Sequence, residues 1–293
     1  MAEYQWYPGH MTKARRMMQE NIRLVDLVIE LADARIPISS RNPDIDDLAA
    51  GKARILLLGK ADLADPVRTE AFRKYYESRG ILVIDLDART RKANEQIRKI
   101  VEKACAAKLE RDRKRGIIGR PLRAMVVGIP NVGKSTFINS FAGRASAKTG
   151  NKPGVTKGKQ WIRLNKNLDL LDTPGILWPK FEDQEVGIRL ALVSAIREEI
   201  LDLNELSLYL LSYLQKEYPD VIPGKYAREG ETFDPALSMP ELLNAIAISR
   251  NLLLKGGEPD CLRTSRLLLD DFKNGKMGRI SLEKPEDLTD HKE

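Results

Sequence analysis

Short apolar runs alternate with polar or helix-like stretches over the first 178 residues of the chain. Six of these runs are rich in branched residues and have the length of buried strands, the last two being close enough for a hairpin. They are Leu24–Ala32, Arg54–Leu58, Ile81–Leu86, Arg123–Gly128, Gln160–Leu164 and Leu168–Leu171. Because nearly continuous apolar strands alternate with helices, we predict a mostly parallel sheet covered on both faces.

The pattern changes near residue 179, where apolar residues take on helical spacing. Four such stretches follow, with Pro and Gly between them and no strand-like run: Gln184–Glu199, Leu203–Glu217, Met239–Leu254 and Leu262–Lys273. We therefore predict an α/β domain over residues 1–178, with an N-terminal arm at 1–20, and a smaller all-helical domain over residues 179–293. Within the first domain, Lys92–Lys108 is predicted as a helix and the basic run Arg111–Arg115 as a loop.

Composition and charge narrow the class of protein. The chain has 293 residues, 42% of them hydrophobic, and its two cysteines lie far apart, which indicates a globular protein with reduced thiols. No apolar run reaches the ~18–20 residues of a membrane span, so a cytoplasmic protein is expected. The net charge is +7; residues 179–293 hold 15 Lys/Arg against 22 Asp/Glu, so the positive charge belongs to the first domain. This distribution suggests a polyanionic partner, although a charge run is often only a solvated face.

The segment GIPNVGKS at residues 128–135 matches the phosphate-loop pattern and stands between a predicted strand and a helix-like stretch. Glycines let backbone amides converge on phosphate oxygens, and the helix N-terminus adds its partial positive charge. Lys134 is expected to reach the β- and γ-phosphates as a catalytic group, and the Ser135 hydroxyl to bind Mg²⁺. The expected nucleotide contacts along this loop are Asn131, Val132, Gly133, Lys134, Ser135 and Thr136.

A second element of the same chemistry is the DTPG sequence at residues 172–175. Asp172 ends an apolar strand, where its carboxylate can hold Mg²⁺ directly or through water, and the Gly175 amide can meet the γ-phosphate. Thr156 lies in the polar stretch between the two motifs. Its hydroxyl can complete the Mg²⁺ shell only when the γ-phosphate is present, which would make that stretch a switch.

A base-reading element precedes the phosphate loop. The sequence GKAD at residues 59–62 resembles the Asn-Lys-x-Asp guanine motif, with Lys60 and Asp62 in the matching places. A carboxylate accepts hydrogen bonds from N1–H and the 2-amino group of guanine, and adenine offers neither donor; each such bond contributes roughly 1.5–3 kcal/mol. Gly59 stands where the motif has Asn, which should weaken binding by about 0.5–1.5 kcal/mol without reversing base choice. Asp87 and Ala88 follow the next strand and can present a backbone amide to the guanine O6.

The order of these motifs is circularly permuted, since the base motifs precede the phosphate loop. Together with Trp6–Lys13 (WYPGHMTK), Asn131 inside the phosphate loop and the late segment Leu268–Pro285, this order resembles the RbgA/YlqF family of bacterial GTPases. The resemblance implies a permuted Rossmann-like G domain, a helical RNA-contacting domain, GTP and Mg²⁺ as ligands, and hydrolysis stimulated by the ribosomal particle. It also implies a catalytic role for His10, whose alternative is a structural histidine, and a K⁺ near Asn131.

The function expected from these features is a GTP-hydrolysing switch in assembly of the large ribosomal subunit, with rRNA and ribosomal proteins as partners. Neither DNA nor a membrane is expected as a partner, and a monomer is expected. The alternatives are an accessory of RNA modification or translation, and a GTP-gated adaptor that hardly hydrolyses, because Ile176 follows the DTPG sequence where many GTPases have Gln. A local basic patch for RNA is expected from Arg263, Arg266, Lys273, Lys276 and Arg279.

Overall fold

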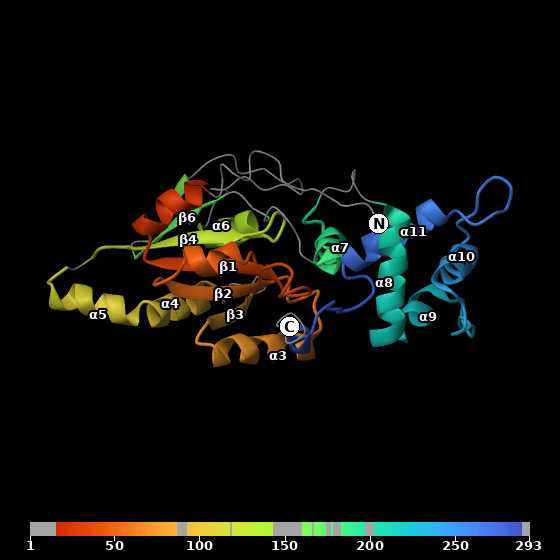
Figure 1. Cartoon of the computed structure of the whole chain (residues 1–293), viewed down its shortest axis with the longest axis horizontal. Coiled ribbons are helices and arrows are strands. Elements are labelled where there is room, and N and C mark those ends of the chain that lie inside the picture. The colour runs from red at the N-terminus through yellow and green to blue at the C-terminus, as the bar shows by residue number, and fades with distance from the viewer. Residues whose placement is uncertain are drawn as a thin grey trace.

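A six-stranded sheet forms the first half of the molecule (Figure 1). The computed structural model describes residues 16–86, 93–117, 119–142, 160–165, 167–173, 177, 183–196 and 202–288. The strands lie in the order β3-β2-β1-β4-β6-β5, and only β5 is antiparallel to its neighbour. Their bounds are β1 Leu27–Asp33, β2 Ala53–Gly59, β3 Leu82–Leu86, β4 Leu122–Gly128, β5 Gln160–Asn165 and β6 Leu168–Asp172. The predicted mostly parallel sheet with a final hairpin is confirmed. The first strand begins three residues later than expected, because residues 22–24 form a 3₁₀ turn, η1 (Ile22–Leu24).

Both faces of the sheet are covered, which explains the nearly unbroken apolar strands. All seven residues of β1 are buried. Helices α4 (Ala93–Ala104) and α6 (Lys134–Ala142) pack on one face, where Ile97 and Phe137 join the cluster around Ile29. The helical residues 16–21, α2 (Asp44–Leu48) and α3 (Pro66–Ser78) cover the other face. The permuted order therefore builds one continuous sheet, because β1 pairs with β2 on one side and with β4 on the other.

The region predicted as one helix followed by a basic loop is instead two helices. Helix α4 ends just before Cys105, and a second helix, α5 (Ala106–Lys114), extends beyond the edge of the sheet (Figure 1). Its residues are mainly good helix formers, and Lys108 pairs with Asp112 at 3.0 Å across one turn. The loop assignment was wrong for residues 111–114, which are helical. The helix ends only at Lys114, and Gly116, with a φ of 69°, follows in the turn after it.

The second half of the described chain is helical. Its helices are α7 Gln184–Leu192, α8 Leu203–Glu217, α9 Val221–Tyr226, α10 Met239–Ser249 and α11 Cys261–Lys273. Acidic side chains cap α7, α8 and α11, and a Ser238–Glu241 capping box begins α10. α10 ends five residues earlier than the periodicity predicts, because Asn251 adopts a φ of 54° and Leu253 bridges to Pro259. No helix in the described part of the chain is long and apolar enough to cross a membrane.

After α11 the chain returns to the sheet half of the molecule. We call residues 278–284 the return segment; it leads to the short helix η3 (Pro285–Leu288), which lies beside α3 (Figure 1). The return segment bonds to two loops of the first half: the Ile280 amide donates to the Leu63 carbonyl at 3.0 Å, and the Leu282 amide donates to the Arg35 carbonyl at 2.7 Å. The last residues of the described chain therefore belong to the sheet half in space.

Candidate functional site

The predicted motifs meet at one edge of the sheet. Because β1, β2, β4 and β6 are parallel, their carboxyl ends share that edge. In the register of the strands, Asp33 lies opposite Gly59, Leu31 opposite Gly128, and Val126 opposite Asp172. The strand order reverses between β1 and β4, and open α/β sheets bind ligands in the crevice at such a point. Residues more than 100 positions apart in the sequence are thereby gathered into one site.

The phosphate loop joins β4 to α6 by a tight turn. Asn131 and Gly133 have φ values of 57° and 102°, so the loop uses the left-handed region twice. A Cβ added to Gly128 would lie 2.6 Å from the Leu31 carbonyl oxygen, so only glycine fits where the loop leaves the sheet. Consecutive amides in this conformation form a concave anion site in front of the N-terminus of α6.

Lys134 begins α6 and turns its side chain back into the loop. Its ammonium is buried and donates to the carbonyls of Gly128 at 2.9 Å and Ile129 at 2.7 Å. Burial lowers the pKa of Lys134 to about 8, and the nearby Asp172 carboxylate opposes that change. Two carbonyls hold the ammonium under the loop, which places it beside the amides that would meet phosphate oxygens.

Asp172 ends β6 in a buried position, and the next residue is equally enclosed. The Thr173 hydroxyl donates to the Val126 carbonyl at 2.6 Å, which fixes the chain where it leaves the sheet beside β4. A carboxylate here and the Ser135 hydroxyl at the start of α6 are oxygen ligands of the type Mg²⁺ prefers. In the described residues no three His, Cys, Asp or Glu side chains gather around a common point. A Mg²⁺ ion would therefore need phosphate oxygens of the nucleotide to complete its shell.

The base motif lies directly beside the phosphate loop. A Cβ at Gly59 would lie 3.3 Å from the Val132 carbonyl oxygen, so the two loops approach closely at the residue that departs from the guanine motif. Lys60 has a φ of 56°, and its ammonium contacts the Asp33 carboxylate at 3.0 Å. Asp62 is exposed in the turn that follows. Glycine at position 59 therefore allows the base loop and the phosphate loop to approach each other closely.

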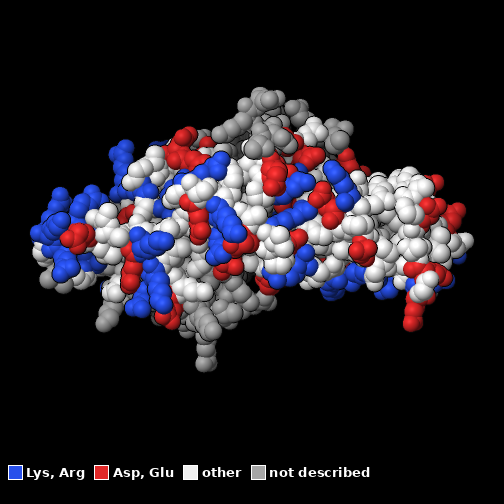
Figure 2. Space-filling view, turned by 90° about the horizontal axis from the view of Figure 1, so that it is seen from below, with Lys and Arg blue, Asp and Glu red and all other residues white. Residues whose placement is uncertain are grey.

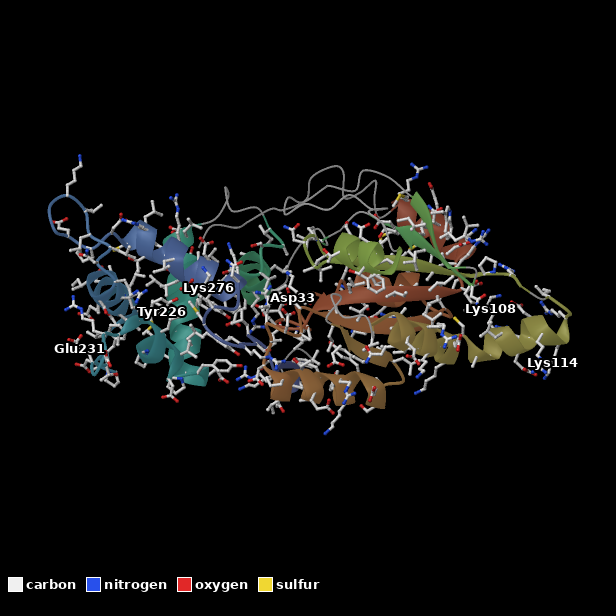
Figure 3. The ribbon with its side chains drawn as sticks, turned by 180° about the vertical axis from the view of Figure 1, so that it is seen from behind. Asp33, Lys108, Lys114, Tyr226, Glu231 and Lys276 are labelled. Atoms are coloured by element: carbon white, nitrogen blue, oxygen red, sulfur yellow. The ribbon has the colours of Figure 1, made fainter. Side chains whose placement is uncertain are left out.

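A buried ion pair beneath this site was missed in the sequence analysis. Arg35 donates to both carboxylate oxygens of Asp33, at 2.9 Å from Nε and 2.8 Å from Nη2, and both residues are almost fully buried. Arg35 and Lys60 hold the pKa of Asp33 well below its usual range, against the opposing effect of burial. The Arg35 guanidinium also lies 5.4 Å from the Phe272 ring centre of α11. Figure 3 shows Asp33 where the strands meet the helical half.

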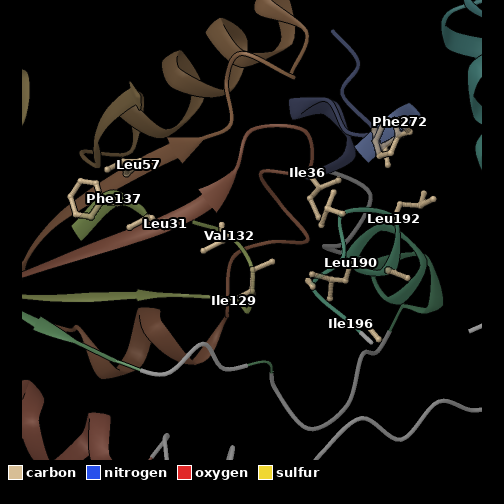
Figure 4. Packing of buried hydrophobic residues seen from close by; sticks show 14 of the residues in the cluster. Leu31, Ile36, Leu57, Ile129, Val132, Phe137, Leu190, Leu192, Ile196 and Phe272 are labelled. Atoms are coloured by element: carbon tan, nitrogen blue, oxygen red, sulfur yellow. The ribbon is translucent and has the colours of Figure 1, made fainter. Parts of the chain in front are cut away.

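The phosphate loop also touches the helical half directly. The Asn131 side-chain amide donates to the Ser194 carbonyl, just after α7, at 2.7 Å. Figure 4 shows apolar side chains of the loop, Ile129 and Val132, on the side of the sheet edge that faces Leu190 and Ile196 of the α7 region. All four belong to the same buried hydrophobic cluster. The residue considered for K⁺ therefore has a structural contact with the helical half.

The structure brings only part of the predicted site together. It places the phosphate-loop residues, Lys134, Asp172 and the loop of Lys60 and Asp62 at one sheet edge. The other predicted residues lie outside the described residues: His10, Asp87, Ala88, Thr156 and Gly175. Of the five late basic residues, Arg279 donates to the Ala61 and Ala64 carbonyls, and Lys276 lies 3.7 Å from the Asp271 carboxylate. Arg279 is therefore engaged with the base loop, and the proposed five-residue patch is not a uniformly free surface.

Comparison with known proteins matches these features to a family. A family model described as a 50S ribosome-binding GTPase matches residues 123–220, which begins at β4 and leaves the base loop outside the match. Proteins named Ribosome biogenesis GTPase A are 44% identical in Bacillus cereus and 34% identical in Thermotoga maritima, and each alignment covers 97% of this chain and 95% of the relative. A GDP-bound structure of T. maritima YlqF superposes with a TM-score of 0.67 at 28% identity, covering 92% of this chain and 99% of that one. A GNP-bound structure of the same protein gives the same TM-score.

Proposed function

Because this chain belongs to the ribosome biogenesis GTPase A family, we propose that it binds and hydrolyses GTP as a switch in assembly of the large ribosomal subunit. The resemblance found in the sequence is confirmed by these relatives and by the YlqF structures. In the proposed cycle the protein binds the maturing particle with GTP and leaves after hydrolysis. It would act as a cytoplasmic monomer on rRNA and ribosomal proteins, with residues 1–178 and 179–293 as its two domains.

One observation carries the proposal: the phosphate loop and the guanine-type loop meet at one sheet edge despite their permuted order. A Cβ at Gly59 would lie only 3.3 Å from the Val132 carbonyl oxygen, so the two loops are close enough for a nucleotide lying along the edge to contact both. Lys134 would meet the β- and γ-phosphates, and Asp62 would accept from the guanine N1–H and 2-amino group. Ser135 and Asp172 would hold Mg²⁺, which offsets charge on the β- and γ-phosphates when it is bound.

The remaining roles are proposed from the sequence and family resemblance. Thr156 and Gly175 would respond to the γ-phosphate, Asp87 and Ala88 would face the guanine O6, and His10 would supply a catalytic group in place of the absent Gln. A K⁺ near Asn131 would act as a positive charge beside the β–γ bridge. The alternative, a GTP-gated adaptor with little hydrolysis, rests on Ile176 after the DTPG sequence, because an isoleucine side chain cannot orient water.

Hydrolysis of GTP and ATP in potassium buffer, with and without purified large ribosomal subunits, tests the proposal. We expect hydrolysis of GTP but not of ATP. Large subunits should strongly stimulate the GTP hydrolysis rate, because the particle would complete the catalytic arrangement. His10→Ala should remove the stimulated rate while leaving GTP binding unchanged. Equal turnover of ATP would refute guanine selection. Absence of stimulation would refute the ribosomal partner, and a full rate in His10→Ala would refute the role of that histidine.

A basic surface on α5 suggests where the first half contacts RNA. Figure 2 shows Lys and Arg side chains gathered at the α5 end of the molecule, and acidic side chains are prominent at the opposite end. Four arginines of this region are exposed and form no ion pair within the described part of the chain: Arg111, Arg113, Arg115 and Arg120. Exposed guanidinium groups that form no close ion pair are suited to phosphate contacts. We propose that this α5 surface contacts the rRNA backbone.

Reversing three charges of this surface, in Arg111→Glu/Arg113→Glu/Arg115→Glu, should weaken binding to large subunits and flatten its salt dependence. A plot of log K against log salt concentration has a negative slope, and each lost phosphate contact reduces the magnitude of that slope by roughly 0.7–0.9. Binding would be measured by sedimentation over a range of KCl concentrations, with GTP turnover in the absence of subunits as a check of the site. The control reverses exposed charges at the other end, Arg228→Glu/Lys255→Glu. An unchanged slope in the α5 variant, or an equal loss in the control, would contradict the proposal.

A further inference from the structure

The loop that carries Asp62 is held from outside by the return segment. The Arg279 guanidinium donates to two carbonyls of that loop, from Nε to Ala64 at 2.8 Å and from Nη2 to Ala61 at 2.8 Å. The Ile280 amide donates to the Leu63 carbonyl at 3.0 Å. Three of the four carbonyls from residue 61 to residue 64 thus accept hydrogen bonds from a segment more than 200 positions later. Because Arg279 spans both sides of Asp62, it fixes the backbone that aims this carboxylate.

The return segment also ties this loop to the neighbouring strand end. The Asp65 amide donates to the Ser281 hydroxyl at 3.1 Å, and the Ser281 hydroxyl lies 3.4 Å from the Ala34 carbonyl oxygen. Farther along, the buried Glu283 carboxylate accepts from the amides of Ile38 at 2.6 Å and Ser39 at 3.0 Å. These bonds anchor Arg279 on the body of the sheet half. The Arg279 side chain is exposed, but its backbone is held in place and its guanidinium is tethered to the loop by two hydrogen bonds.

Few of the restraints on the backbone of residues 61–64 come from the loop's own turn. Its own turn is closed by the Leu63 amide, which donates to the Lys60 carbonyl at 2.9 Å, and by a longer bond of 3.4 Å from the Ala64 amide to the Ala61 carbonyl. Gly59 has no side chain to brace the loop against the phosphate loop, and Lys60 holds a positive φ of 56°, which is strained for a residue with a Cβ. The charged hydrogen bonds of Arg279 are among the strongest that reach the loop.

We propose that Arg279 is a positioning residue for guanine recognition, holding the Asp62 carboxylate in line with N1–H and the 2-amino group of the base. The inference rests on the proposed role of Asp62 in the function above. It assigns to a residue that follows α11 a part in the selectivity of the nucleotide site. It also adds a connection between the nucleotide site and the C-terminal part of the chain, at the base end of the site, beside the contacts of Asn131 and Arg35.

Affinities for GDP and IDP, measured by titration calorimetry, test this role. Inosine lacks the 2-amino group, so the ratio of the two affinities reports how well Asp62 engages the base. We expect the unmodified protein to prefer GDP by about tenfold or more, the factor for one charge-assisted hydrogen bond. Arg279→Ala should reduce that preference by about three- to tenfold, mainly through weaker GDP binding, and Arg279→Lys should restore part of it because an ammonium can reach one carbonyl.

The control is Arg266→Ala, an exposed arginine on α11, which should leave the ratio unchanged. If Arg279→Ala lowers the melting temperature but keeps the GDP/IDP ratio, Arg279 is only structural and the inference is overturned. If Arg279→Ala does not fold, Arg279→Gln, whose amide is too short to span both carbonyls, provides the same test by its ratio. Equal affinities for GDP and IDP in the unmodified protein would instead refute the role of Asp62 itself, which separates failure of the proposed function from failure of this inference.

Discussion

Lys134→Met is expected to lower kcat/KM for GTP by about a thousandfold or more, the scale seen when one preorganised charge or donor is removed from a transition state. The Lys134 ammonium is buried among the carbonyls of the phosphate loop, where a charge interacts more strongly with phosphate than it would in water. Methionine keeps an unbranched apolar side chain in the same space. Steady-state hydrolysis in potassium buffer with large subunits present would measure the loss.

A melting curve of each variant separates loss of chemistry from loss of fold. Lys134→Met should remain folded, because it removes a desolvated ammonium whose burial is reflected in a pKa lowered to about 8. Lys255→Met, at an exposed lysine far from the site, serves as the matched control and should hydrolyse GTP at the original rate. Turnover of Lys134→Met within tenfold of the unmodified protein would show that this lysine does not serve the γ-phosphate.

Arg35→Ala is expected to lower the free energy of unfolding by about 3–5 kcal/mol, the cost of removing one partner from a buried ion pair. The change leaves the Asp33 carboxylate almost fully buried with Lys60 as its remaining positive partner at 3.0 Å. It also removes the cation from the Phe272 ring of α11. Urea unfolding followed by circular dichroism would give the free energy, provided that the transition remains two-state.

The pH dependence of the free energy of unfolding at acid pH tests the Asp33–Arg35 pair independently. Since the folded-state pKa of Asp33 lies below its unfolded value, its contribution is present above the ordinary carboxyl range and is lost as pH falls through the lower folded value. Arg35→Ala should shift that loss to higher pH. Arg16→Ala, which breaks an exposed pair with Glu20, is the control and should cost no more than about 1 kcal/mol. A similar small effect of Arg35→Ala would show that the buried pair is not needed for stability.

Three contacts connect the nucleotide site with the C-terminal part of the chain. Asn131 reaches the chain after α7, Arg35 lies under Phe272, and Arg279 holds the base loop. Asn131 makes this contact at the phosphate loop, Arg35 at the end of β1, and Arg279 at the base loop. A structural change at any of these contacts can therefore alter the position of the C-terminal part of the chain. A nucleotide-dependent switch needs this kind of coupling.

The sequence by itself determined the strands, the phosphate loop and the permuted order, because these depend on local patterns. A buried parallel strand is a short apolar run, and a phosphate loop must combine glycines, lysine and a hydroxyl within eight residues. The positions of Gly128 and Asp172 at strand ends followed from the same periodicity. Local patterning failed at element ends and at two short helices. The basic run in α5 was taken for a loop although its residues favour a helix, and α9 was not predicted.

Tertiary structure alone decided which polar side chains support the site. Arg279 bonds to the Ala61 carbonyl 218 positions away, and Arg35 meets α11, so neither role leaves a periodic or motif signal in its own neighbourhood. The same holds for Gly59, whose lack of a side chain has a visible reason only beside the Val132 carbonyl. Local periodicity records which face of a strand or helix is buried, whereas a hydrogen bond between distant segments depends on how the packed elements meet in space.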